Sequence, residues 1–187
     1  MPARVSEALI LRTYPLGEAD LIVSFFTRDQ GKLRGVARRA RRPKSQFGAS
    51  LERLAHVRVH YYQPEQRELV RLSSCELIQS QFELAASYAT GVTLDYVAEV
   101  SEQLLPPGEQ NERFFRLLLL VLEYLRRWRD AAVWPAVTYY TLWAVRLSGF
   151  LPQLRLSEQD QRIQELMLKR SLLEITPEGW SRSTGAD

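Results

Sequence analysis

Two kinds of hydrophobic pattern divide the chain, and the change falls near residue 80. From residue 5 to residue 78, short segments alternate apolar and polar side chains or are rich in β-branched and aromatic residues, as strands are. Five such segments occur, at 6–13, 21–27, 32–37, 57–62 and 69–77. Gly31 stands where a hairpin turn needs a positive φ angle. Five strands in so short a stretch predict a small closed or partly open β-barrel, because closure removes exposed strand edges.

Helical periodicity begins after residue 78. We predict helices over 81–105, 112–128 and 135–148, and a weaker one over 158–174. Asn111 is a suitable N-cap for the second helix, whose FFRLLLLVLEYL segment is apolar nearly all round and therefore central. Segment 47–54 is expected to form a short helix that plugs the barrel. The fold class is thus α+β: an OB-type five-stranded barrel over 1–80 is followed by an all-α domain over 81–187, with 175–187 as a flexible tail.

Composition narrows the classes of protein. Of 187 residues, 45% are hydrophobic and 25% charged, which is typical of a soluble globular protein. The longest apolar run, 117–122, is far shorter than the roughly 20 residues of a membrane span, and the first ten residues do not resemble a secretory signal. The single cysteine, Cys75, excludes an internal disulfide and a Cys-rich zinc site. We expect a cytosolic protein that needs no membrane, metal or cofactor.

Charge is distributed unevenly between the two parts. Residues 1–80 hold 14 basic and 8 acidic side chains, a balance of +6, whereas residues 81–187 hold 11 and 14, a balance of −3. This asymmetry indicates an N-terminal part that meets a polyanion and a C-terminal part with another task. The alternative is a chance difference between two small domains.

The densest functional signal is the basic run 34–44, RGVARRARRPK. Such a density of cations repels itself unless an anion lies against it, and arginine side chains suit phosphate oxygens. We therefore predict nucleic-acid binding, the alternative being a solvated basic loop. The run contributes Arg34, Arg38, Arg39, Arg41, Arg42 and Lys44, and Arg12, Lys32, Arg53, Arg58 and Arg71 are candidates to widen the patch. The aromatic candidates for base stacking, each with core packing as the alternative, are Tyr14, Phe47, Tyr61 and Tyr62.

Enzyme signatures are mostly absent. The sequence has no glycine-rich phosphate-binding motif. His56 and His60 lie four apart on a predicted strand, about 13 Å from one another, so packed or solvated histidines are favoured over a metal site. Glu18 and Asp20 could form half of a nuclease carboxylate cluster, or could cap a turn. Cys75 is expected to be a small buried hydrophobe. We expect no catalytic residues.

The N-terminal string is specific enough to compare with a known family. ALILRTYPLGEADLIVSFFTRDQGKLRGVARRARRPKSQFGASLERL resembles the opening of the bacterial RecO recombination-mediator family. The features that carry the resemblance are Leu11-Arg12-Thr13, Gly17-Glu18-Ala19-Asp20, Phe26-Thr27, Gly31-Lys32-Leu33 and Ala40-Arg41-Arg42-Pro43-Lys44-Ser45 with Phe47. Glu76-Leu77, the FFRLLLLVLEYL segment and Leu147-Ser148-Gly149-Phe150-Leu151-Pro152 resemble later parts of the family, so the likeness covers residues 5–152.

The resemblance implies a DNA-repair protein without bond-breaking activity, located in the bacterial cytoplasm at the nucleoid. Family members bind single- and double-stranded DNA, anneal complementary strands and, with RecR and in some settings RecF, help load RecA onto strands coated by single-stranded DNA-binding protein. They also recognise the acidic C-terminal tail of that protein. By position, the six cations of the basic run would contact phosphates, supported by Arg12 and Lys32. A rim for the acidic tail is expected at Arg126, Arg127 and Arg129 near Trp128, although arginines at a helix end are commonly solvated.

One departure from the family and two alternatives stand beside this interpretation. Many members carry a four-cysteine zinc module after the turn that matches Phe150-Leu151-Pro152, and QLRLSEQDQRIQELMLKR, which follows here, has no cysteine. The chain is also short for the family. The first alternative is an RNA-binding or ribosome-associated OB protein that uses the same basic run. The second is a metal-dependent nuclease with Glu18 or Asp20 in its site.

Overall fold

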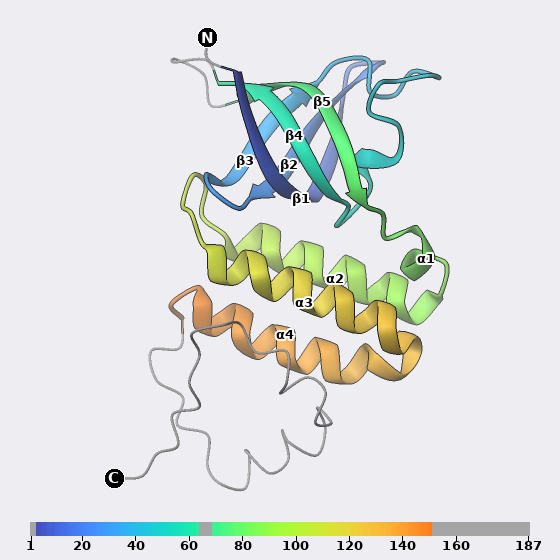
Figure 1. Cartoon of the computed structure of the whole chain (residues 1–187), viewed down its shortest axis with the longest axis vertical. Coiled ribbons are helices and arrows are strands. Elements are labelled where there is room, and N and C mark those ends of the chain that lie inside the picture. The colour runs from blue at the N-terminus through green and yellow to red at the C-terminus, as the bar shows by residue number, and fades with distance from the viewer. Residues whose placement is uncertain (1–2, 64–68, 151–187) are drawn as a thin grey trace, which may run out of the picture.

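A five-stranded barrel stands on a layer of helices (Figure 1). The structure is a computed structural model that describes residues 3–63 and 69–150. The strands are β1 (Ala3–Leu16), β2 (Asp20–Thr27), β3 (Gly31–Ala37), β4 (His56–Tyr62) and β5 (Leu69–Gln79). The helices are the 3₁₀ segment η1 (Gly48–Leu51), then α1 (Phe82–Ala85), α2 (Tyr88–Leu104), α3 (Glu112–Trp128), the 3₁₀ segment η2 (Arg129–Ala132) and α4 (Val133–Leu147).

The barrel closes in the order β1-β2-β3-β5-β4, with β1 also pairing with β4. Every strand pair is antiparallel except β3–β5, which is parallel. This is the OB fold, and the predicted class, a five-stranded barrel followed by helices, is confirmed. Gly31 ends the β2–β3 turn with a φ of +74°, as its position in the sequence required. η1 supplies the plug, because Phe47 and Leu51 belong to the core inside the barrel.

Two hydrophobic cores meet across strand β2. Phe25 points into the barrel, where its ring lies 6.1 Å from that of Tyr61. Phe26 points outward, and its ring lies 6.0 Å from that of Phe114 and 5.8 Å from that of Phe115 on α3. Adjacent residues on a strand face opposite sides, so both phenylalanines are fully buried in different cores. The helical core therefore includes outward-facing barrel residues, and the two parts pack as one body.

The helices differ from the sequence expectation in one respect. The predicted helix over 81–105 is wrong as a single element, because α1 and α2 are separated at Ser87, whose backbone is extended. Serine commonly stands at a helix start rather than inside a helix, since its side chain competes for backbone hydrogen bonds. Two apolar residues of the predicted range, Phe82 and Tyr88, are 70% and 87% exposed.

The other two helices follow the sequence closely. The Asn111 side chain accepts a hydrogen bond from the Phe114 N–H at 3.0 Å, which confirms the N-cap of α3. α4 begins two residues before Pro135, which is tolerated in a first turn. The helix predicted over 158–174 and the tail over 175–187 lie outside the described residues. Among the helices that the structure does describe, none is long and apolar enough to cross a membrane.

Candidate nucleic-acid interface

The loop that follows β3 carries most of the basic run. The first half of this loop is hydrogen-bonded to the turn between β1 and β2 and to the first residue of β2. Asp20 Oδ1 accepts a hydrogen bond from the Arg39 N–H at 2.8 Å. The Arg41 N–H donates to the Ala19 carbonyl at 3.0 Å, and Arg41 Nη1 donates to the Gly17 carbonyl at 3.3 Å. Asp20 therefore orders the basic loop, which gives it the turn-capping role that the sequence left open.

The second half of the loop is fixed to the barrel wall and interior. Phe47 is buried in the barrel core, and Gln46 Nε2 donates to the Ser73 carbonyl on β5 at 2.6 Å. Arg39 and Lys44 adopt positive φ angles of 57° and 64°. A left-handed backbone costs a non-glycine residue roughly 1–2 kcal/mol, so these anchors offset a local strain that places the cationic side chains.

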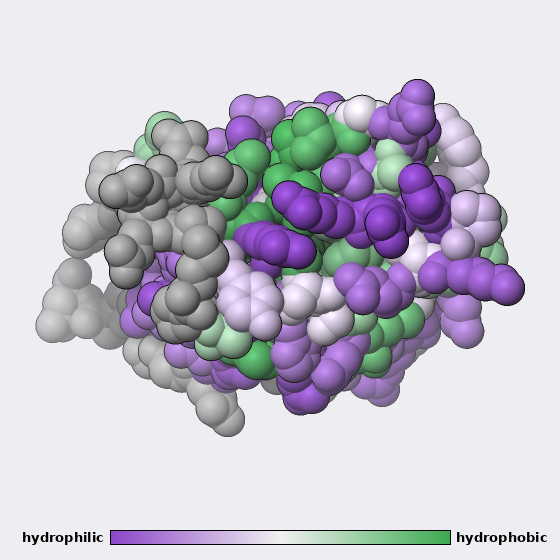
Figure 2. Space-filling model, turned by 90° about the horizontal axis from the view of Figure 1, so that it is seen from above, coloured by the Kyte–Doolittle hydropathy of each residue, from purple (hydrophilic) through white to green (hydrophobic). Residues whose placement is uncertain are grey.

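A basic cleft lies between this loop and β5, with a volume of about 610 Å³. It is lined by Arg38, Arg39, Arg42, Pro43, Lys44, Ser45, Gln46 and Arg71. Five of the eight lining residues are cations, and all five are exposed. Viewed onto the barrel, strongly hydrophilic side chains gather across one part of the face in Figure 2. The cleft can therefore attract and hold a polyanion.

Arg71 joins this cleft because of the sheet topology. It lies 27 positions after Lys44 in the sequence, but parallel pairing sets it beside Val36 on β3. The sequence supplied Arg71 only as one of several cations that could widen the patch. Arg53 and Arg58, the others on that list from the same region, pair instead with Asp95 and Glu76.

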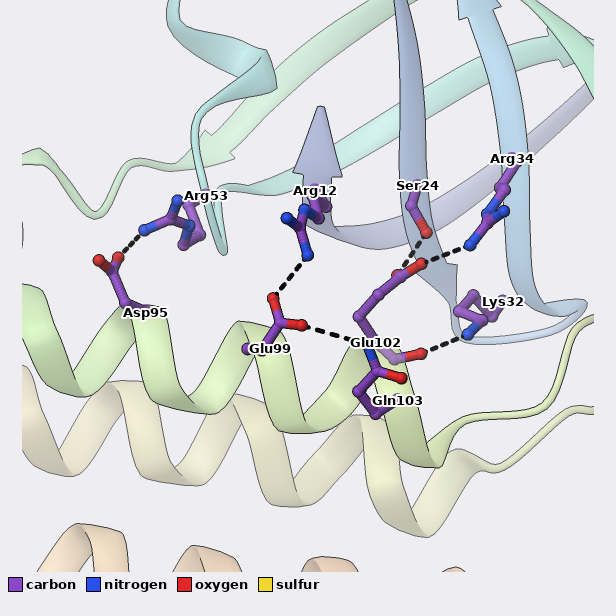
Figure 3. Close-up of polar contacts among 9 residues, drawn as sticks. All are labelled: Arg12, Ser24, Lys32, Arg34, Arg53, Asp95, Glu99, Glu102 and Gln103. Atoms are coloured by element: carbon purple, nitrogen blue, oxygen red, sulfur yellow. Dashed lines mark hydrogen bonds and ion pairs between the residues drawn. The ribbon is translucent and has the colours of Figure 1, made fainter. Parts of the chain in front are cut away.

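Three predicted DNA contacts face the helices instead of the cleft (Figure 3). Arg12 Nη1 lies 2.8 Å from Glu99 Oε2, and Arg34 Nη2 lies 2.9 Å from Glu102 Oε1. Lys32 is 6% exposed, and its Nζ donates to the backbone carbonyl of Glu102 at 2.5 Å. Burial lowers the pKa of Lys32 below its ordinary value. We therefore leave Lys32 out of the candidate DNA contacts, since the helical layer covers its ammonium group.

The proposed stacking aromatics divide in the same way. Phe47 and Tyr61 are buried in the barrel core, so core packing, the alternative stated for them, holds. Tyr14 lies beneath the guanidinium of Arg12, with the Arg12 Cζ 5.2 Å from the ring centroid. Tyr62 is exposed near the end of β4.

The remaining chemistry-bearing candidates have structural partners. His56 Nε2 lies 2.7 Å from Glu7 Oε1, and His60 Nε2 lies 3.0 Å from Glu76 Oε1. Within residues 3–63 and 69–150, no group of three or more His, Cys, Asp or Glu side chains has the geometry of a metal site. Cys75 is buried in the barrel core, as expected, and burial raises the pKa of its thiol to about 12.

The predicted partner rim lies at the end of α3. Arg126 Nη1 donates to Gln81 Oε1 at 3.1 Å, and partial burial lowers the pKa of Arg126. The Arg127 Cζ lies 5.4 Å from the Trp128 ring centroid, and Trp128 is 44% exposed. Arg127 and Trp128 thus present a cationic and aromatic surface, whereas Arg126 is engaged with the start of α1.

Two family models match consecutive parts of this chain. The Recombination protein O N-terminal model matches residues 1–81, which contain the barrel, and the Recombination protein O C-terminal model matches residues 86–157, which contain the helices. The chain belongs to the RecO family.

Curated relatives with this family name cover a similar range. The DNA repair protein RecO of Koribacter versatilis is 49% identical over 149 residues, which are 80% of this chain and 60% of the relative. Those of Salinibacter ruber and Symbiobacterium thermophilum are 32% identical over 149 residues and 31% over 148, covering 79% of this chain and 56% and 57% of the relatives. This chain thus matches between 56% and 60% of the length of these three RecO proteins.

Proposed function

We propose that this RecO-family chain is a DNA-repair protein that binds DNA in the basic cleft and acts by binding, without breaking bonds. The observation that carries the proposal is the convergence of five exposed cations, from the loop after β3 and from β5, on one cleft. Apart from these charges, the cleft offers serine and glutamine side chains, which also bind phosphate oxygens. Contacts of this kind give affinity without sequence specificity.

The cleft supports binding to either single- or double-stranded DNA. Both present closely spaced phosphates, and each neutralised phosphate releases counterions. Two complementary strands repel one another, so a cationic surface that holds one strand lowers the repulsion felt by the second. Strand annealing follows from this electrostatic effect, and it requires neither ATP nor a metal ion.

We further propose the partners that the family implies. RecR, in some settings RecF, and the acidic C-terminal tail of single-stranded DNA-binding protein would join the chain in loading RecA onto coated DNA. The exposed pair Arg127 and Trp128 is the surface we favour for the acidic tail, because it joins a cation to an apolar ring. Arg126 contributes less, since Gln81 already accepts its hydrogen bond.

An annealing assay tests this function directly. Two complementary oligonucleotides carrying an energy-transfer pair are mixed with and without the protein, one strand being pre-coated with single-stranded DNA-binding protein. We expect faster annealing in the absence of ATP and metal, and suppression by salt. Matched RNA strands serve as competitors, because preferential binding of RNA would favour the ribosome-associated alternative. Binding without acceleration would contradict the annealing activity but retain a nucleic-acid-binding barrel.

Charge reversal locates the site. Arg39→Glu with Arg42→Glu places two carboxylates in the cleft and should abolish most DNA binding. The matched control is Arg113→Glu with Arg146→Glu, which changes net charge equally but lies on α3 and α4. Unchanged affinity in the cleft variant, or an equal loss in the control, would remove the cleft as the DNA site.

A further inference from the structure

A row of polar side chains crosses the outer face of β1, β2 and β3. Strand register places Arg12 beside Ser24, and Ser24 beside Arg34. Residues paired across neighbouring strands project from the same face of a sheet. Two guanidinium groups therefore flank a hydroxyl at one level of the barrel. In OB folds, the face of the second and third strands is one that binds oligonucleotides.

Helix α2 covers this row with carboxylates (Figure 3). Glu99 Oε2 lies 2.8 Å from Arg12 Nη1. Glu102 accepts from Arg34 Nη2 at 2.9 Å through Oε1, and from Ser24 Oγ at 2.6 Å through Oε2. One turn before Glu99 on the helix, Asp95 pairs with Arg53. Positions 95, 99 and 102 share one face of an α-helix, so the three carboxylates form an acidic stripe toward the barrel.

The acidic stripe occupies the groups that a phosphate backbone would use. Each of its carboxylates pairs with a barrel arginine whose side chain is 45–54% exposed. The Arg12–Glu99 and Arg53–Asp95 pairs are half exposed on both sides, and such pairs contribute little to folding stability. Glu102 is buried and also anchors α2 through Ser24, and the apolar packing of Phe26 on α3 joins the barrel to the helices as well. The stripe also has an electrostatic consequence: it neutralises Arg12 and Arg34 on this face and Arg53 in the loop before β4, which would otherwise attract DNA.

The basic cleft lies beyond the C-terminal end of β3, the strand that carries Arg34. Arg34 is the central residue of β3, and the end of the strand that precedes it contacts the helical layer, where Lys32 bridges to Pro107. Arg38 follows the other end, and the four residue steps from Arg34 to Arg38 correspond to about 13 Å along an extended strand. Within the basic run, Arg34 is thus neutralised by Glu102, whereas Arg38, Arg39, Arg42 and Lys44 line the cleft.

We propose that the acidic stripe on α2, Asp95, Glu99 and Glu102, acts as a built-in competitor for phosphate that closes the outer face of β1–β3 and confines DNA to the basic cleft. The proposal rests on the proposed function for its DNA readout. Glu99 and Glu102 are positioning residues in this scheme: they touch no DNA, but they decide which barrel cations do.

The test frees Arg12 and Arg34 from their ion pairs with Glu99 and Glu102 while keeping the volume of the replaced side chains. The two-carboxylate variant carries Glu99→Gln and Glu102→Gln, and binding of fluorescent oligo-dT is measured over a series of NaCl concentrations. For single strands, each added phosphate contact steepens the plot of log affinity against log salt concentration by about 0.7. We expect a steepening of about 1.4 for two contacts, together with tighter binding at low salt.

Arginine replacements make the result specific. Arg12→Gln with Arg34→Gln should leave the salt dependence of the unmodified protein unchanged, yet should cancel the steepening in the two-carboxylate variant. The control Glu83→Gln with Glu123→Gln alters net charge equally on other helices and should not reproduce the effect, although it releases Arg129 from Glu83. The proposal is overturned by an unchanged slope in the two-carboxylate variant, by equal steepening in the control, or by a shallower slope when the arginines are replaced in the unmodified protein.

Two further arms keep the outcome decisive. If the two-carboxylate variant fails to fold by circular dichroism, Asp95→Asn with Glu99→Gln releases Arg53 and Arg12 while leaving the buried Glu102 in place, and the same steepening is expected. Heparin is titrated in parallel as a sulfated polyanion. If the unmodified protein does not bind DNA, the proposed function is contradicted. The salt dependence of heparin binding would still show whether the acidic stripe neutralises the arginines on the outer face of the barrel. Identical heparin slopes in variant and unmodified protein would overturn the inference.

Discussion

Ser24 on β2 and Glu102 on α2 are 78 residues apart in the sequence, and Ser24 Oγ donates a hydrogen bond to Glu102 Oε2 at 2.6 Å. Both residues are buried: Ser24 is fully buried, and the side chain of Glu102 is 4% exposed. A hydrogen bond to a carboxylate in such a place is shorter and stronger than one between neutral groups. It fixes how far along the barrel α2 lies, and with it the position of the acidic stripe.

Ser24→Ala should destabilise the protein by about 1.5–3 kcal/mol, because the buried carboxylate loses a donor and gains no water in its place. Ser6→Ala is the matched control, since the buried Ser6 Oγ lies 3.3 Å from the Tyr61 hydroxyl and forms a bond between neutral groups. We expect a loss of about 1 kcal/mol or less there. Urea unfolding measures both, and equal losses would contradict a charged bond at Glu102.

Gly31→Ala should be more harmful than Gly17→Ala. Both glycines have positive φ angles, +74° and +61°. At Gly31 a Cβ would also lie 2.2 Å from the backbone oxygen of Glu109, whereas at Gly17 it would meet open space. Left-handed backbone alone costs alanine roughly 1–2 kcal/mol, so unfolding in urea should show about that for Gly17→Ala and clearly more for Gly31→Ala. Equal values would argue against the close approach of the loop before α3.

Phe25→Ala and Phe26→Ala should each cost about 3–5 kcal/mol, but in different parts of the molecule. Of the four tryptophans, the three that the structure describes, Trp128, Trp134 and Trp143, lie in the helical part of the chain, so tryptophan fluorescence reports mainly on that part. We expect Phe26→Ala to shift the fluorescence transition to lower urea than the far-ultraviolet circular dichroism transition of the whole chain. For Phe25→Ala, in the barrel core, we expect the fluorescence transition to occur at higher urea than the circular dichroism transition. The same order in both variants would contradict separate cores.

Stability should fall as pH rises above about 9. Burial raises the pKa of Cys75 from 9.0 to about 12 and that of Tyr139 from 10.0 to about 12. Between those values the folded state binds more protons than the unfolded chain, so each group reduces the free energy of unfolding by up to about 1.4 kcal/mol per pH unit.

The titration of Lys32 changes the free energy of unfolding in the opposite direction. Its lowered pKa makes the unfolded chain bind more protons as the pH approaches 10.5, which raises stability and offsets part of the loss. Cys75→Ala is the variant that separates the groups: the decline should then begin near pH 10, where Tyr139 starts to contribute, instead of near pH 9. Urea unfolding at pH 8, 9 and 10 checks this, and an unchanged onset would show that the thiol is not responsible.

Local pattern predicted much of this protein. The strand at 21–27 and the helix at 112–128 were located from the sequence because each buries a face whose period is visible in a few consecutive residues. The basic run was equally visible, and the resemblance of the N-terminal segment to the RecO family is confirmed by the two family models. The break at Ser87 was missed, since apolar spacing continues across it and serine is only a weak signal.

Tertiary structure decided which cations remain available. Arg34 and Arg38 belong to one run, yet Glu102 neutralises the first while the second lines the cleft. Arg71 reaches the cleft through parallel pairing of β3 with β5, and Lys32 is covered by the helical layer. The sequence by itself determined the elements and the total charge, because these depend on neighbours along the chain. Strand register and helix docking determined where that charge is exposed, because the carboxylates that neutralise Arg12 and Arg34 lie 87 and 68 residues away in the sequence.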